Sequence, residues 1–245
     1  MRQQPRSSQP TAGWTTDVSS AFALAGFLAL VFVGFTLLAM GPLVAVDGYF
    51  NIRTPPHGWL AVLHVLDRVG QRTVCLLLLL PLTWRLVKES RSWRPLVVVV
   101  VSILAQNFVV GILKLSLGRG EPATGNPDFF VGGLAYPSGH TSNIVMVYGL
   151  MPYLLFTYSR SYRRLAHVLT WLVVGLSLVM VAVSLTLTWH WFADLISGLL
   201  IGGMMLSLTT GVDQAVPDDI FAGGFVHGLR RLPHVIVSAA RHPVA

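Results

Sequence analysis

Residues 95–117 read PLVVVVVSILAQNFVVGILKLSL, and Lys114 is the one charged side chain among them. An α-helix needs about 20 predominantly apolar residues to cross the hydrocarbon core of a bilayer. A soluble domain could bury one such segment in its core, but this chain repeats the pattern along most of its length. The stretch therefore indicates a transmembrane helix within a larger membrane domain.

Five other segments carry the same apolar signal: 21–46, 59–87, 140–158, 165–187 and 191–210. The chain is 53% hydrophobic and 11% charged, whereas a soluble domain has about 25% charged residues. The sequence thus predicts an all-α fold, a polytopic membrane helical bundle with about six transmembrane helices. The first half of 59–87 is amphipathic, so one long protruding helix and a surface helix followed by a short span both fit.

The predicted organisation is one membrane domain between two polar ends. We expect a cytoplasmic N-terminal segment at 1–20, the six-helix domain at 21–212, and a cytoplasmic, weakly amphipathic tail at 213–245. The longest internal loop, 118–137, is rich in Gly and Pro. The single cysteine, Cys75, excludes an internal disulfide and a cysteine-based metal site.

Positive charge predicts the orientation of the bundle. With the N-terminus inside, twelve of the 17 Lys and Arg residues fall in cytoplasmic segments, which is what the positive-inside rule favours. The loop 118–137 is then extracytoplasmic, in a multi-pass protein of the cell membrane. The cations are spread over short loops and form no basic face, so we expect membrane lipids as partners and no nucleic acid.

Three polar stretches would meet at the outer surface, namely 114–122, 136–141 and 189–194. His190 and Asp194 are four residues apart and share a helix face, so the carboxylate can orient the imidazole. Pro137-Ser138-Gly139-His140 places a turn before a helix, where unpaired backbone N–H groups attract anions.

These residue types point to phosphoryl transfer. One histidine would act as the nucleophile and the other would protonate the leaving oxygen. Lys114 and Arg119 supply positive charge for the phosphoryl oxygens. The sequence has no carboxylate cluster for magnesium in these stretches, so we expect a metal-free reaction without a cofactor.

The same residues resemble the three motifs of the type 2 phosphatidic acid phosphatases, integral-membrane lipid phosphatases related to vanadium haloperoxidases. The family patterns are K-x6-R-P, P-S-G-H and S-R-x5-H-x3-D, and the resemblance covers about residues 60–210. It implies that His190 accepts the phosphoryl group, that Asp194 orients it and that His140 is the general acid. It also implies that Lys114, Ser138 and Gly139 bind phosphate and that no metal is needed.

The chain departs from the family patterns at two positions. Glu121 stands where the first motif has arginine, and Ser184 stands where the third motif has arginine. We expect Arg119, two residues from the first gap, to reach the phosphate instead. We expect Glu121 to pair with Arg119 or another cation, or to face water.

The expected function is hydrolysis of a lipid phosphate or diphosphate through a phosphohistidine at the outer leaflet. Polyprenyl diphosphate, phosphatidic acid and phosphatidylglycerophosphate all fit as substrates. A phosphotransferase that uses the same phosphohistidine is an alternative, and so is a non-catalytic lipid-binding protein. The missing arginines favour the last alternative, while His140, His190 and Asp194 argue against it. The sequence leaves the oligomeric state open.

Overall fold

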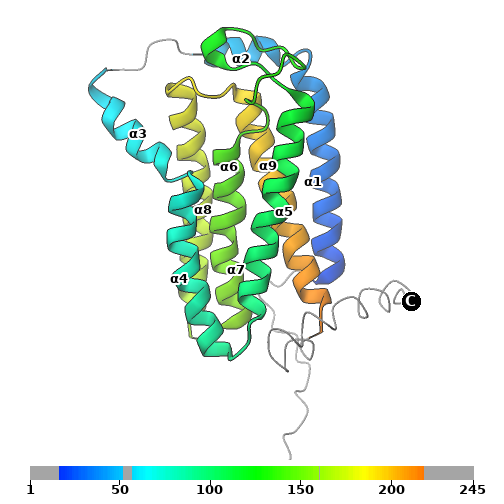
Figure 1. Ribbon diagram of the computed structural model, residues 1–245, viewed down its shortest axis with the longest axis vertical. Helices are drawn as coiled ribbons and strands as arrows, with labels where there is room; N and C mark the ends of the chain where they lie inside the picture. The colour runs from blue at the N-terminus through cyan, green and yellow to red at the C-terminus, as the bar shows by residue number, and fades with distance from the viewer. Residues whose placement is uncertain (1–16, 52–56, 160, 218–245) are drawn as a thin grey trace, which may run out of the picture.

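The computed structural model describes residues 17–51, 57–159 and 161–217, which form helices and connecting turns without a strand (Figure 1). The long helices lie side by side along one axis: α1 (Val18–Ala39), α4 (Arg72–Ser90), α5 (Arg94–Leu117), α7 (Gly149–Tyr158), α8 (Arg163–Thr186) and α9 (Phe192–Ala215). The predicted all-α bundle is therefore confirmed.

Four segments of the described chain are long and apolar enough to cross a membrane: Val18–Ala39, Arg94–Thr124, Arg163–Thr186 and Phe192–Ala215. The α4 helix runs beside them, as does a continuous helical run made of α6 (Gly139–Asn143), the π-helical turn η3 (Ile144–Tyr148) and α7 (Figure 1). A multi-pass membrane protein is confirmed, and "about six" is an approximate count of its spans.

The first predicted span is shorter than expected. The α1 helix ends at Ala39, and a separate helix, α2 (Val44–Phe50), crosses the end of the bundle (Figure 1). Pro42 explains the break, because a proline disfavours helical backbone in the residue before it. Asp47, which directly follows the predicted span 21–46, consequently lies in α2 and is buried.

The structure resolves the ambiguous segment 59–87 into two helices. A short helix, α3 (Leu60–Arg68), follows a 3-10 turn, η1 (His57–Trp59), and stands away from the bundle, while α4 begins at Arg72 (Figure 1). Gly70 lies at the break. A Cβ on this glycine would stand 3.0 Å from the His140 Cβ atom, so a larger residue would push the break away from the bundle.

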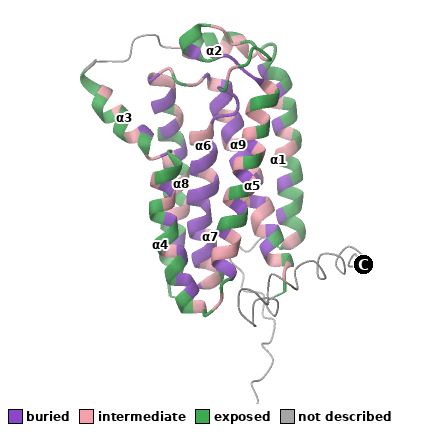
Figure 2. Ribbon diagram, in the orientation of Figure 1, coloured by how far each residue is buried: buried purple, intermediate pink, exposed green. Residues whose placement is uncertain are grey.

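The α9 helix lies inside the bundle and packs against α1 and α6. A Cβ on Gly202 would stand 2.8 Å from the Ser142 carbonyl oxygen, and one on Gly203 would stand 3.3 Å from Leu28. Small residues let transmembrane helices approach closely, which is how α9 contacts two neighbours at once. Figure 2 shows the result, since buried residues are concentrated along α6, α7 and α9.

Large apolar side chains project outward from the outer helices. Leu30 is 75% exposed on α1, Phe108 is 68% exposed on α5 and Trp171 is 72% exposed on α8. In water such a surface would be unfavourable, whereas lipid tails are as apolar as these side chains. The outward faces of these helices therefore fit a lipid environment.

A polar cluster joins three helices at the end of the bundle where α9 finishes. The Asp213 carboxylate accepts hydrogen bonds from Arg94 Nε at 2.7 Å, from the Tyr153 hydroxyl at 2.6 Å and from the Tyr158 hydroxyl at 2.7 Å. Asp213 was predicted to begin the tail, but α9 continues to Ala215. The rest of the predicted tail, from 218 on, lies outside the described residues.

Candidate active site

The Pro-Ser-Gly-His turn is held against the first turn of α9. The Ser138 N–H donates to the Asp194 carbonyl oxygen at 2.9 Å, and the Thr141 hydroxyl donates to the Leu195 carbonyl oxygen at 3.0 Å. Gly198 permits this contact, because a Cβ there would collide with Thr141 Oγ1 and with the Ser138 carbonyl oxygen. The structure thus joins two motifs that are more than 50 residues apart in sequence.

His190 and Asp194 face each other at the start of α9. The Nδ1 atom of His190 lies 3.5 Å from Asp194 Oδ2, which also accepts a hydrogen bond from the Trp191 N–H at 2.9 Å. The Asp194 side chain has no exposed surface. The carboxylate is therefore fixed behind the imidazole, and the Nε2 edge of His190 is left for other contacts.

Arg119 contacts the Asp194 carboxylate at Oδ1, whereas His190 lies near Oδ2. Its guanidinium donates to Asp194 Oδ1 at 2.7 Å and forms a second ion pair with Asp47, while its Nε donates to the Pro127 carbonyl oxygen at 2.9 Å. The Arg119 side chain is completely buried. This differs from the expectation that Arg119 reaches a phosphate, because two carboxylates and a carbonyl occupy its donors.

Sequence analysis did not single out Asp47 as a member of this cluster. Its Oδ1 atom accepts a hydrogen bond from the Ala193 N–H at 2.8 Å, so Asp47 also caps the first turn of α9. Burial raises the pKa of the Asp47 carboxyl, and the ion pair with Arg119 opposes this effect. No local pattern could have revealed the pair, since 72 residues separate Asp47 from Arg119.

A cavity of about 470 Å³ opens beside the two histidines. The ring centroids of His140 and His190 are 6.4 Å apart across it. A group between them can lie within hydrogen-bond reach of both, about 3 Å from each. The described residues that line the cavity are Lys114, Glu121, Ala123, Leu134, Ala135, Gly139, His140, Thr188, Trp189 and His190.

The residues predicted from the motifs therefore fall into two groups. Lys114, Gly139, His140 and His190 line the cavity, and Ser138, Arg119 and Asp194 lie buried behind it. The Lys114 ammonium donates to the Leu134 carbonyl oxygen. The Ser138 hydroxyl is buried and has no hydrogen-bond partner among the described residues.

The two departures from the family patterns lie in different places. Glu121 is exposed and lines the same cavity as Lys114, with which it has a favourable charge interaction, while Arg119 is engaged elsewhere. Ser184 is 1% exposed and does not line the cavity. Its hydroxyl donates to Met180 Sδ at 3.6 Å, so Ser184 packs within the bundle and not against the substrate cavity.

A second carboxylate, Asp67, approaches the site from α3. Its Oδ2 atom lies 3.5 Å from His140 Nε2, and the side chain is 1% exposed. The sequence predicted that the first half of 59–87 is amphipathic, and the structure places the Asp67 carboxylate on the buried side of this segment. In the described residues, no three His, Cys, Asp or Glu side chains gather closely enough to hold a metal ion.

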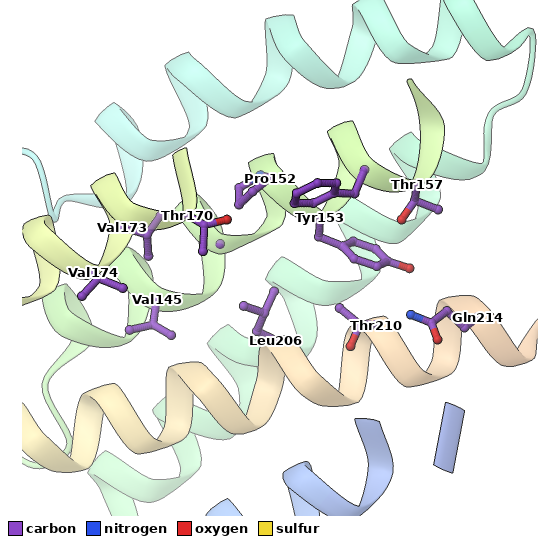
Figure 3. Close-up of a pocket in the computed structure, with 12 residues that line it drawn as sticks. Val145, Pro152, Tyr153, Thr157, Thr170, Val173, Val174, Leu206, Thr210 and Gln214 are labelled. Atoms are coloured by element: carbon purple, nitrogen blue, oxygen red, sulfur yellow. The ribbon is translucent and has the colours of Figure 1, made fainter. Parts of the chain in front are cut away.

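Another cavity, of about 250 Å³, lies between α7, α8 and α9 (Figure 3). Its lining is mainly apolar, as at Val145, Pro152 and Leu206, with Thr210 and Gln214 toward the end of α9. None of the motif residues lines this cavity. The motif residues are thus associated with the histidine cavity and not with this one.

Comparison with known proteins agrees with this geometry. Residues 95–218, slightly more than half of the chain, match the PAP2 superfamily. No curated protein matches the chain. Among solved structures, the crystal structure of the first transmembrane PAP2 type phosphatidylglycerolphosphate phosphatase from Bacillus subtilis is similar. Its TM-score is 0.67 at 18% identity, over 79% of this chain and 98% of that chain.

At that identity the structural likeness concerns the fold. The family match carries the assignment, because it spans Lys114, the turn at Ser138 and the pair of His190 with Asp194. The resemblance seen in the motifs is confirmed, and the chain belongs to the PAP2 superfamily.

Proposed function

We propose that this protein is a membrane phosphatase that hydrolyses a lipid phosphate through a phosphohistidine on His190. One observation carries the proposal. His140 and His190 line a single cavity with ring centroids 6.4 Å apart, and the buried Asp194 stands 3.5 Å behind His190. Membership of a family of lipid phosphatases supports the same reaction class.

The reaction has two steps. In the first, Nε2 of His190 forms a bond to phosphorus while the bond from phosphorus to the leaving oxygen breaks, and that oxygen takes a proton from His140. In the second, a water oxygen attacks phosphorus and gives a proton to His140, the phosphorus–nitrogen bond breaks and phosphate leaves. Asp194 stabilises the imidazolium that forms on His190.

The cavity offers donors for the charge on the phosphoryl oxygens. Lys114 lines it, and the first N–H groups of α6, at Gly139 and His140, have no acceptor within that helix. The unpartnered hydroxyl of Ser138 lies at the same helix start. Donors that are already oriented cost no reorganisation when charge develops on the oxygens, so they stabilise the transition state efficiently.

The charge distribution supports an extracytoplasmic site. The basic residues in the last turns of α4, in the α4–α5 turn and at the starts of α5 and α8 lie at the end of the bundle opposite the cavity (Figure 1): Arg85, Lys88, Arg91, Arg94, Arg163 and Arg164. Cytoplasmic ends carry the excess of Lys and Arg. The substrate would keep its tail in the outer leaflet and place its headgroup in the cavity.

The substrate classes that fit are phosphatidylglycerophosphate, phosphatidic acid and polyprenyl diphosphates. The similar Bacillus structure is named as a phosphatidylglycerolphosphate phosphatase, which supports the first of these. Each presents a terminal phosphate on an apolar tail. The cavity has a cation, Lys114, to bind the phosphate and a histidine, His140, to protonate the oxygen that leaves.

The test is phosphate release by the purified protein in mixed micelles of each lipid, with a chelator present. His190→Ala should reduce release by more than about 1,000-fold, since removal of a nucleophile abolishes the covalent route. His167→Ala is the matched control, because His167 lies on α8 and packs against Phe156 away from the cavity. Equal release by wild type and His190→Ala would overturn the proposal, and a phosphorylated alcohol in place of free phosphate would indicate a phosphotransferase.

A further inference from the structure

The α3 helix has two unlike faces. Trp59, the residue before α3, and Val62 and Val65 within it recur at every third position, are 64%, 47% and 62% exposed, and lie on the side away from the bundle. Asp67 lies on the opposite side and is 1% exposed. A short peripheral helix thus directs its one carboxylate inward, to the wall of the histidine cavity.

The backbone after Asp67 is anchored to the helical run that carries His140. The Tyr148 hydroxyl donates to the Val69 carbonyl oxygen at 2.9 Å, and the Asn143 amide donates to the Gly70 carbonyl oxygen at 3.3 Å. Gly70 allows the backbone after Asp67 to approach His140 closely, since a Cβ at this position would lie only 3.0 Å from the His140 Cβ atom. These contacts fix the distance between α3 and the His140 ring.

The imidazole of His140 is the group that can compensate the buried Asp67 carboxylate. Both oxygens of the carboxylate and the Nε2 atom of His140 are buried and lack a hydrogen-bond partner among the described residues, yet Oδ2 and Nε2 are 3.5 Å apart. A buried carboxylate without a compensating donor or charge is strongly unfavourable. A proton on Nε2 of His140 supplies that compensation, because it gives the carboxylate a cationic donor.

Other charged groups act on the same pair. Burial disfavours a positive charge on His140, and His190 and Lys114 act in the same direction, while Asp67 is the neighbour that favours the charge. His64, on α3, adds a weaker interaction with Asp67, and Glu121 lines the cavity as well. Burial raises the pKa of the Asp67 carboxyl, and His140 is the strongest of the histidines that oppose this effect. Asp67 is therefore the carboxylate in direct contact with a ring that has cationic neighbours.

We propose that Asp67 is a positioning residue for His140, which it holds as an imidazolium with Nδ1 directed to the leaving oxygen. This inference rests on the proposed phosphatase function and goes beyond the family motifs, which contain no residue of α3. The Cδ2–Nε2 edge of the His140 ring faces Gly70 and Asp67, so Nδ1 lies on the other edge. The proton on Nδ1 passes to the leaving oxygen, the proton on Nε2 stays with Asp67, and the attacking water restores the first proton in the second step.

The site thus contains two histidine–carboxylate pairs with separate tasks. Asp194 supports the nucleophile His190, and Asp67 supports the acid His140. Each carboxylate lies 3.5 Å from its ring. A positioned general acid accelerates a reaction by about 100- to 10,000-fold, and the benefit depends on how poor the leaving group is.

That dependence provides the test. Asp67→Asn keeps the shape of the side chain and removes its charge. With an alkyl phosphate lipid, we expect kcat to fall by about 10- to 100-fold with little change in KM. With p-nitrophenyl phosphate, whose leaving group needs no proton, we expect a fall of less than about threefold. The alkaline limb of the pH profile for the alkyl substrate should move to lower pH, because the imidazolium loses its counter-charge.

Three further variants make the test specific. Asp67→Glu should recover part of the activity, and Arg68→Gln, an exposed neighbour, should leave it unchanged. In a His140→Ala background, Asp67→Asn should cause no further loss, because its effect acts through His140. Equal losses on both substrates, or a loss that adds to that of His140→Ala, would overturn the proposal. The phosphatase function itself would stand in that case as long as His190→Ala alone abolishes release.

Discussion

Arg119 occupies an unusual position for a loop arginine, because a carboxylate contacts each end of its guanidinium. Asp194 and Asp47 are both completely buried in this contact, as is Arg119 itself. Three buried charges of which two are negative leave one negative charge that the cluster does not neutralise. Arg119 is therefore the residue that compensates the buried charge of both carboxylates.

This asymmetry predicts unequal effects of mutation. Arg119→Gln leaves two buried carboxylates without their cation and should lower the free energy of unfolding by about 3–5 kcal/mol. Asp47→Asn retains an oxygen that can accept the Ala193 N–H and leaves Arg119 paired with Asp194, so its cost should be less than half as large. Thermal unfolding in detergent measures both. An Asp47→Asn variant as unstable as Arg119→Gln would contradict this account of the cluster.

The position of Glu121 in the cavity leads to a prediction about the affinity for the lipid phosphate. Glu121 lines the cavity with Lys114 and is exposed, and interactions of exposed charges are worth up to about 1 kcal/mol. Glu121→Gln should therefore lower KM for a lipid phosphate by about two- to fivefold, with the larger effect at low salt. Asp128→Asn, in the same loop but outside this cavity, is the control. An unchanged or higher KM for Glu121→Gln would mean that the carboxylate assists the substrate.

Residues with a local pattern were predictable from the sequence, and residues without one were not. His190 with Asp194 and the turn at Ser138 are short motifs whose spacing can be recognised in one dimension. Asp47 and Asp67 acquire their roles only when distant helices fold onto the motifs. Arg119 shows the complementary error, because its proximity to a gap in the motif says nothing about which partners lie closer in space.

At the level of elements, the long apolar runs predicted the spans well and the short helices poorly. Hydropathy over about 20 residues is a strong signal because lipid demands it. The α2 and α3 helices are too short to carry that signal. The start of α2 was predicted as the end of the first span, and α3 was predicted as part of the segment 59–87. These two elements nevertheless contribute the carboxylates behind Arg119 and His140.

The contact between α9 and the turn before α6 provides a test at this scale. Gly198→Ala would drive a methyl group into Thr141 Oγ1 and the Ser138 carbonyl oxygen, which displaces the turn from the cavity. We expect phosphate release to fall by at least about tenfold, because small displacements of reacting groups are costly. Gly175→Ala in α8 is the matched control, since its Cβ meets nothing within 4 Å. Comparable activity for the two alanine variants would show that the turn tolerates the shift.

The whole molecule is polar at both ends, and the two ends differ in kind. One end holds the histidine cavity, while the other holds the basic residues and the cluster of Arg94 with Asp213. Asp213 joins α5, α7 and α9 at the basic end, so buried polar contacts stabilise the bundle at the end that lies opposite the proposed active site. The cavity end is held instead by the ion pairs of Arg119.

This polarity predicts which residues face the cell exterior. Ala123 lines the cavity and is exposed, and Ser161 is exposed in the turn between α7 and α8 at the basic end. Cys75, the one native cysteine, is buried, so single cysteines can be introduced at either position with little background. A membrane-impermeant maleimide should label Ala123→Cys in intact cells and Ser161→Cys only after permeabilisation. The reverse pattern would place the cavity on the cytoplasmic side, where the lipid phosphates of the inner leaflet would be its substrates.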